Sequence, residues 1–238
     1  MTTELEVGIR LVYYTPVPLK VKDIKKYPGY FCVIFEKPEN FHFYAGQYLD
    51  YELPVKDPLG NTRSFTISAS PTEDFLMLST RHGKTVFKKA LEKIKPGDQI
   101  KASHPAGTFT LDEKSPAVMI AGGIGITPFR SMIKDALYRK LKTPITLIYS
   151  NSDDDFPFRN DLNNWQKKLK NLKIHYINTT TQGKLGPEKL KQLTMNNELF
   201  TIYYLAGPPK MVDSFDNILQ SLGVEKENIR YDHFDGYL

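Results

Sequence analysis

Cysteine is almost missing from this chain, since Cys32 is the only one among 238 residues. A single thiol cannot form a disulfide within the chain, and it cannot supply the several thiolates that hold an iron–sulfur cluster. Any such cluster used by the protein would therefore lie on a partner. Cys32 itself falls in the apolar run 30–35, so we expect an ordinary core residue there.

Several other signals are also lacking. No apolar stretch approaches the roughly 20 residues that a membrane-spanning helix needs. Residues 1–6 lack the basic start and apolar run of a secretory signal, so we expect a cytoplasmic location. The five histidines show no metal-ligand spacing, and no metal site is predicted. Basic and aromatic residues do not interleave as they do on nucleic-acid-binding surfaces.

The charge balance is mildly basic. The formal net charge is +5 and the pI is near 9.0, with four lysines gathered between residues 20 and 26. A positive surplus is compatible with docking a small acidic protein, and equally with a solvated surface.

The first half of the chain reads as β structure. We expect short strands over 7–13, 29–36, 48–53, 63–69, 75–80 and 98–103, separated by Pro- and Gly-containing turns. One helix over Val86–Ile94 interrupts them. Six short strands with such turns suggest a closed antiparallel barrel.

The pattern changes after residue 112, which predicts two domains over 1–112 and 113–238. Strands are expected over 117–121, 145–149, 173–178, 201–205 and 228–232, and helices over 128–140, 157–170, 187–194 and 208–221. This alternation implies a parallel sheet with helices on both faces. Ligands bind beyond the carboxyl ends of such strands, where Ser150 and Asn151, the stretch 179–183 and the stretch 206–209 converge.

The most informative stretch is the glycine-rich run Ala121–Pro128, between an apolar strand and a helix. Its glycines permit a tight turn and close approach to a bulky anion, with Thr127 as a possible cap and Pro128 at the first helical position. A helix start offers free N–H groups to a pyrophosphate. The run predicts dinucleotide binding by Gly122, Gly123, Ile124, Gly125, Ile126, Thr127 and Pro128.

Two further runs carry candidate chemistry. In Arg63-Ser64-Phe65-Thr66, the arginine offers donors for a pyrophosphate, the aromatic can pack on a flat ring and a hydroxyl can bind a ring nitrogen. Arg63 and Phe65 share one face of the strand, and Ser64 and Thr66 the other. A second run, 79–86, is a strand leading into a helix, with free N–H groups near Gly83 and Thr85 for another phosphate.

Together, these runs and their order resemble the ferredoxin–NADP reductase superfamily of flavin-dependent NAD(P)H oxidoreductases over nearly the whole chain. The resemblance implies an N-terminal six-stranded antiparallel Greek-key barrel that binds FAD, and a C-terminal α/β domain with a five-stranded parallel sheet that binds NAD(P). It places Arg63 on the flavin pyrophosphate, Phe65 against the isoalloxazine and Thr66 near its N5. The other implied cofactor-binding residues of the barrel are Ser64, Ser79, Thr80, Arg81, Gly83, Lys84 and Thr85.

The resemblance extends to the C-terminal half. The run 205–211 is similar to the C-G-P-P-x-M motif beside the nicotinamide, which implies roles for Ala206, Gly207, Pro208 and Met211. The tail 232–237 is similar to E-x-F-x-G-Y. It implies positioning roles for Asp232, Phe234 and Tyr237, with an aromatic covering the flavin. Phe65, Ala206 and Asp232 depart from the usual Tyr, Cys and Glu.

The implied reaction is hydride transfer between NAD(P)H and FAD, followed by electron transfer to a ferredoxin, a flavodoxin or a small acceptor. Thr66 is the first candidate for a catalytic role, with Phe234, Tyr237 and Asp232 after it. The stretch 178–184 lacks arginine, which favours NADH over NADPH. Two alternatives stay open: an electron-transfer subunit whose substrate binds another chain, and a module that senses dinucleotide without turnover.

Overall fold

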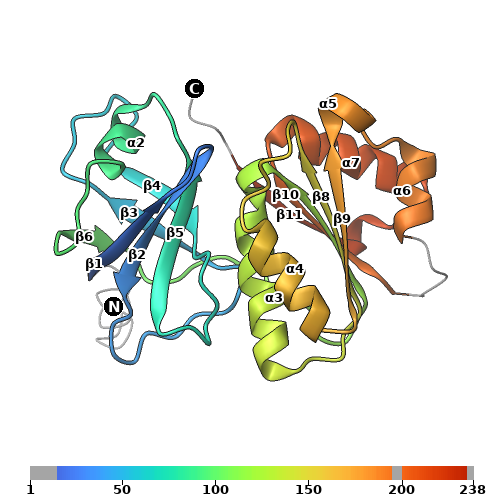
Figure 1. Cartoon of the computed structure of the whole chain (residues 1–238), viewed down its shortest axis with the longest axis horizontal. Helices are drawn as coiled ribbons and strands as arrows, with labels where there is room; N and C mark the ends of the chain where they lie inside the picture. The colour runs from blue at the N-terminus through green and yellow to red at the C-terminus, as the bar shows by residue number, and fades with distance from the viewer. Residues whose placement is uncertain (1–14, 195–199, 235–238) are drawn as a thin grey trace, which may run out of the picture. The chain divides into compact units, whose positions relative to one another are not determined.

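The computed structural model of the chain describes residues 15–194 and 200–234 (Figure 1). It divides into two compact units, Met1–Thr108 and Phe109–Leu238, shortly before the boundary predicted after residue 112. None of the helices in the described ranges combines the length and apolar character that crossing a bilayer requires.

The described part of the first unit is a six-stranded antiparallel barrel. Its strands are β1 (Val17–Lys26), β2 (Tyr30–Glu36), β3 (Tyr48–Glu52), β4 (Thr62–Thr66), β5 (Phe75–Arg81) and β6 (Gln99–Ala102). They lie in the order β4-β3-β6-β1-β2-β5. A bridge between Ile67 and Leu78 joins the two edge strands and closes the barrel.

One strand of the barrel was not predicted. We predicted the first strand over 7–13, which lies outside the described residues, and missed β1. β1 buries only Leu19 and Val21 fully, while lysines occupy the alternate positions and face solvent. Lys20 pairs there with Glu36 of β2 at 2.8 Å. With so few apolar positions and a bulge after Val21, the alternation was too short to stand out.

The helix of the barrel is shorter than predicted. It is α2 (Val86–Leu91), and the Thr85 hydroxyl caps it by accepting a hydrogen bond from the Lys88 N–H at 3.3 Å. The helix buries Phe87 and Leu91 against the barrel, which is the apolar face that its spacing predicted.

The second unit is a five-stranded parallel sheet with helices on both faces. The strands β7 (Ala117–Gly122), β8 (Ile145–Asn151), β9 (Leu172–Asn178), β10 (Ile202–Gly207) and β11 (Ile229–His233) lie in the order β11-β10-β7-β8-β9. The helices are α3 (Thr127–Arg139), α4 (Arg159–Lys168), α5 (Thr179–Gln182), α6 (Pro187–Thr194) and α7 (Pro209–Ser221). Short 3₁₀ turns cover Gly123–Ile126 and Lys226–Asn228.

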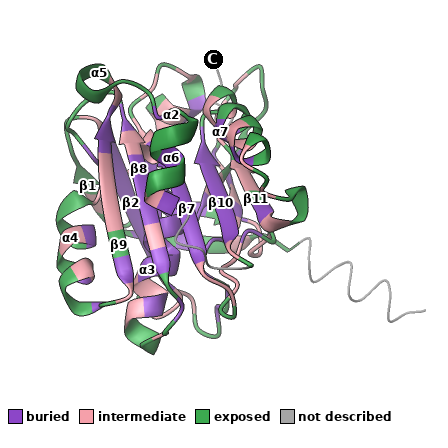
Figure 2. Ribbon diagram, turned by 90° about the vertical axis from the view of Figure 1, so that its right-hand side faces the viewer, coloured by how far each residue is buried: buried purple, intermediate pink, exposed green. Residues whose placement is uncertain are grey.

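Two apolar layers flank the sheet. Val118, Ile120 and Ile148 pack with α6 and α7 residues such as Leu190 and Phe215 in one cluster. On the opposite face, the ring of Phe109 contacts both Tyr204 of β10 and Phe129 of α3. β7 and β10 are buried along their whole length, as their colour in Figure 2 shows. This explains why both read as continuous apolar runs.

The core of the second unit should be intolerant of truncation. Ile148 has no exposed surface and lies in the cluster under α6 and α7. We expect Ile148→Ala to lower the free energy of unfolding by about 2–5 kcal/mol, because it leaves a cavity. Urea unfolding measures this. Tyr138→Ala is the control, since that side chain is 67% exposed and its loss should cost little. Equal losses in both variants would contradict this packing.

Candidate functional site

Arg63 lies buried beneath the loop that joins β3 to β4. Its side chain is 2% exposed, and its Nη1 donates to the carbonyls of Leu59, Gly60 and Thr62 at 2.7–3.0 Å. Its Nη2 pairs with the Asp57 carboxylate at 3.1 Å. The guanidinium carbon lies 5.4 Å from the centre of the Phe87 ring. Arg63, which we expected to bind a phosphate, is therefore bound by groups of its own chain.

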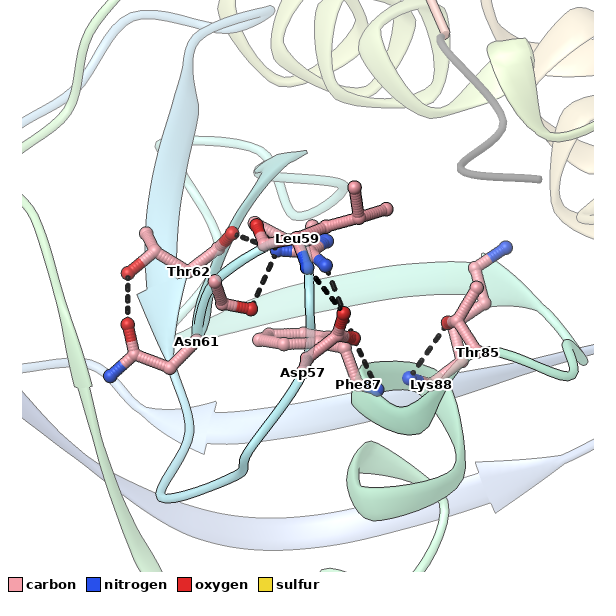
Figure 3. Close-up of polar contacts among 9 residues, drawn as sticks. Asp57, Leu59, Asn61, Thr62, Thr85, Phe87 and Lys88 are labelled. Atoms are coloured by element: carbon pink, nitrogen blue, oxygen red, sulfur yellow. Dashed lines mark hydrogen bonds and ion pairs between the residues drawn. The ribbon is translucent and has the colours of Figure 1, made fainter.

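Asp57 joins this loop to the start of α2. Its Oδ1 accepts from the Leu59 N–H at 2.9 Å, and its Oδ2 accepts from the Phe87 N–H at 3.2 Å (Figure 3). The N–H groups of Leu59 and Phe87, together with the Arg63 guanidinium, hold the pKa of Asp57 below its usual value. An ionised carboxylate thus occupies the point where a guanidinium and a backbone donor converge. Asp57 was not predicted as a site residue, because 57–61 reads simply as a turn.

The remaining residues of the β4 motif fall on the two faces that we predicted. Phe65 shares the Arg63 face, with its ring 6.1 Å from Phe87 and 6.0 Å from Tyr51 between centroids. Ser64 is exposed and donates to the Asp50 carboxylate on β3. Thr66, on the Ser64 face, is buried. The half-buried Phe65 ring is the flat apolar surface in this motif.

The second barrel motif is only partly directed outward. The Ser79 hydroxyl donates to the Cys32 sulfur at 3.2 Å inside the barrel, so its cofactor role stays a prediction. Thr80 is also buried, and its hydroxyl contacts the Arg81 carbonyl at 3.4 Å. Gly83, Lys84 and Thr85 follow at the surface as the loop before α2.

In the second unit, the turns after β7 and β10 are in direct backbone contact. A Cβ on Gly125 would lie 2.3 Å from the Ala206 carbonyl oxygen, and one on Gly122 would lie 2.3 Å from the Met211 sulfur. Gly207 has a φ of +152°, with the Gly122 Cα 3.1 Å from where its Cβ would be. Gly125 and Gly207 are therefore required by contact between backbone segments, and Gly122 leaves room for the Met211 side chain.

The turn after β7 differs in detail from the prediction. A 3₁₀ turn begins at Gly123, whose φ is +55°, and α3 follows directly. The Thr127 hydroxyl donates to the Ile124 carbonyl at 3.1 Å, so Thr127 does not cap the helix. The buried Tyr149 donates to the Gly123 carbonyl at 2.9 Å and fixes the turn from β8. The first N–H groups of such a turn lack intrahelical acceptors, which leaves donors at the carboxyl edge of the sheet.

The polar residues after β8 form a local network. The Asn151 amide donates to Asp153 Oδ1 at 2.7 Å and to the Asp155 carbonyl at 2.8 Å. The Thr179 hydroxyl donates to the Asn151 carbonyl at 3.2 Å, which ties this loop to α5. Asn151 therefore shapes the loop, while Ser150 is half-buried beside it.

The C-terminal motifs meet at the same edge of the sheet. Ala206 pairs in register with Asp232, and the Phe234 N–H donates to the Gly207 carbonyl at 3.0 Å. Pro208 precedes α7, whose Met211 lies under Gly122. Burial raises the pKa of Asp232 to about 6. Tyr237 lies outside the described residues.

The described residues contain no cluster of three or more histidine, cysteine, aspartate or glutamate side chains that could hold a metal ion.

Three sequence comparisons relate this chain to known proteins. Residues 119–217 match the model of the oxidoreductase NAD-binding domain family. The chain is 27% identical over 209 residues to flavohemoprotein A of Dictyostelium discoideum, covering 81% of this chain and 52% of that protein. It is 30% identical over 246 residues to the flavohemoprotein of Candida albicans, covering 96% and 56% respectively. The chain thus spans about half the length of these relatives.

A solved structure covers both units. A ferredoxin NADP⁺ reductase from Neisseria gonorrhoeae with bound FAD and NADP has a TM-score of 0.77 at 20% identity, over 92% of this chain and 98% of that one. The chain shares the fold of this reductase over both units. The two-unit fold expected from the sequence is confirmed.

The residues present fit FAD and NAD(P) as cofactors. A carboxylate already sits between the Arg63 guanidinium and the Phe87 N–H, so the barrel holds an anion there. In the second unit, the strand order brings β7 and β10 side by side at the point where the chain reverses direction across the sheet. Dinucleotides bind at such a point in doubly wound sheets.

The glycine contact at this point predicts a steric failure. Gly125→Ala should destabilise the second unit by about 1–3 kcal/mol, because its Cβ meets backbone that cannot rotate away. Gly186→Ala is the matched control, since a Cβ there meets nothing within 4 Å. Thermal unfolding compares them. An unchanged Gly125→Ala variant would show that the two turns are not in contact.

The raised pKa of Asp232 predicts that the stability of the protein depends on pH. Its pKa of about 6 lies above the ordinary 3.8, so folding favours its protonated form. The associated stability is present at low pH and is lost as the pH rises through 6. The stability of Asp232→Asn relative to wild type should therefore increase from about pH 4 to about pH 6.5 and then stay constant. Urea unfolding across this range tests it. A difference that does not change with pH would contradict the burial of this carboxyl group.

Proposed function

We propose that this chain is an FAD-dependent NAD(P)H oxidoreductase. The observation that carries the proposal is the glycine-lined meeting of the β7 and β10 turns, within residues that match an oxidoreductase NAD-binding family. The barrel with its buried arginine supports the flavin part. A cytoplasmic location stays a prediction.

The barrel residues would hold FAD. Arg63 and the backbone donors at the start of α2 would bind its pyrophosphate, with Lys84 and Thr85 nearby in sequence. Phe65 would pack against the isoalloxazine, and Thr66 would hydrogen-bond near its N5. When bound, FAD accepts a hydride from a reduced nicotinamide and passes electrons on singly or in pairs. The protein aligns the ring and excludes water, so Thr66 acts by positioning.

The second unit would hold NAD(P)H at the carboxyl edge of its sheet. The turn Gly123–Ile126 supplies N–H donors for the pyrophosphate, and the stretch 206–208 would lie against the nicotinamide. Phe234, tied to Gly207, and Tyr237 would position the nicotinamide ring. Asp232 would place a half-buried carboxyl group beside that ring.

We infer that NADH is the preferred donor. The Thr179 and Thr180 hydroxyls donate to the carbonyls of Asn151 and Ser152. Both hydroxyls are therefore used within the protein and are poorly suited to binding a phosphate. Arg159 stacks on the Tyr176 ring of β9 with its guanidinium carbon 4.6 Å from the centroid.

The electron acceptor is proposed to be a small acidic protein, such as a ferredoxin or flavodoxin, or a small molecule. A second candidate is an electron-transfer component of a larger redox complex. It is favoured by the share of the relatives, about half their length, that this chain covers. A direct discriminator is whether the purified chain reduces a carrier protein without a further component.

The proposal predicts a yellow protein that one pyridine nucleotide bleaches. The test is an anaerobic titration of the FAD-loaded protein with NADH and NADPH separately, followed at 450 nm, the approximate flavin maximum. Thr66→Ala should slow flavin reduction about tenfold, the equivalent of one hydrogen bond, while FAD retention changes little. Thr62→Ala on the same strand is the control. A protein that binds no flavin, or equal losses of rate and retention in Thr66→Ala, would contradict the assignment.

A further inference from the structure

Asp57 occupies the position that an incoming phosphate needs. Its carboxylate meets the same two donors that a flavin pyrophosphate would use, the Arg63 guanidinium at 3.1 Å and the Phe87 N–H at 3.2 Å. Both side chains of the pair are almost fully covered, with 2% and 5% exposed. A second anion there is disfavoured, because two like charges would share one buried cation.

We propose that Asp57 is an internal competitor for the flavin pyrophosphate. In the flavin-free barrel it neutralises Arg63, and on flavin binding it leaves together with the loop that carries it. This inference rests on the proposed function, because it takes FAD as the ligand of the barrel. It adds a residue outside the predicted motifs that sets the affinity for the cofactor.

The loop is built so that Asp57 and its neighbours move as one piece. The Leu59 N–H binds the Asp57 carboxylate, and the Gly60 N–H donates to the Asp57 carbonyl at 2.9 Å. Gly60, with a φ of +85°, allows the chain to turn back. The loop meets Arg63 through the carbonyls of Leu59 and Gly60 and through the Asp57 carboxylate. Loss of the carboxylate contact therefore weakens the attachment of the whole turn.

The energetic consequence is a reduced apparent affinity. When a ligand must displace a bound competitor, its apparent affinity is its intrinsic affinity multiplied by the fraction of molecules in which the site is open. Charge-assisted hydrogen bonds to a buried guanidinium are the strong ones, so the reduction should be large enough to measure. The benefit to the chain is that Arg63 is never buried without a counter-charge before flavin arrives.

The test compares Asp57→Asn with wild type by FAD fluorescence quenching. The variant should bind FAD about tenfold more tightly, since the carboxylate no longer competes. Asp74→Asn is the matched control, because it removes the same charge from an exposed side chain of the same unit. Riboflavin, which has no phosphate, should bind wild type and Asp57→Asn equally.

The Arg63→Gln background sharpens the result. If Asp57 acts through Arg63, Asp57→Asn should have no effect on FAD affinity once Arg63 is Gln. Weaker FAD binding by Asp57→Asn, or an equal gain for riboflavin, would overturn the proposal. If neither wild type nor Asp57→Asn binds any flavin, the proposed function fails as well. If FAD binds both equally, only the competition fails.

Hydrogen exchange of the wild-type protein covers the case in which Asp57→Asn does not fold. Ligand binding normally slows exchange, but here FAD should speed it over residues 54–61 while slowing it at the start of α2. Slower exchange over 54–61 on FAD binding would show that the loop closes on the flavin with Asp57 in place, and would overturn the proposal.

Discussion

A buried guanidinium must be matched by negative charge, and in the barrel this constraint falls on Arg63. Burial of an uncompensated cation is costly, so the chain supplies three carbonyls and one carboxylate to a side chain that is 2% exposed. The same requirement supports the proposal that Arg63 binds a phosphate, because a planar fork of donors suits a pyrophosphate. The β3–β4 loop, the start of α2 and the Phe87 ring are all arranged around this one charge.

The second unit depends on a different constraint, the close approach of two turns. β7 and β10 are adjacent although β8 and β9 come between them in the chain, so their following turns meet at the edge of the sheet. Gly125 and Gly207 allow the backbones to meet, and Gly122 leaves room for the Met211 side chain. Tyr149 then fixes the carbonyl of Gly123 from the neighbouring strand. These contacts hold the N–H groups of the turn in place.

Much of the fold was predictable because the second unit buries whole strands. β7 and β10 read as continuous apolar runs and the α7 helix as an amphipathic period, and both signals are strong. β1 was missed because lysines alternate with only two fully buried residues, so its signal is weak over any short window. α5 was also missed, since a single turn started by Asn178 has no period to detect.

The candidate site was predictable only as a set of motifs. The sequence indicates that Arg63 and the glycine run handle phosphate, but not which partners they have, because those come from distant segments. Asp57 reaches Phe87 over 30 positions of sequence, and Ser79 turns inward to Cys32 over 47. Thr127 is a residue type that often caps helices, but its hydroxyl donates to the Ile124 carbonyl in the preceding 3₁₀ turn. Such contacts depend on tertiary structure, which no local pattern encodes.

The most direct test of this account is a crystal structure of the chain grown with FAD. The account predicts that pyrophosphate oxygens lie within hydrogen-bond distance of the Arg63 guanidinium and the Phe87 N–H, with the Asp57 carboxylate withdrawn from both. Flavin bound in the barrel with the Asp57–Arg63 pair intact would contradict it.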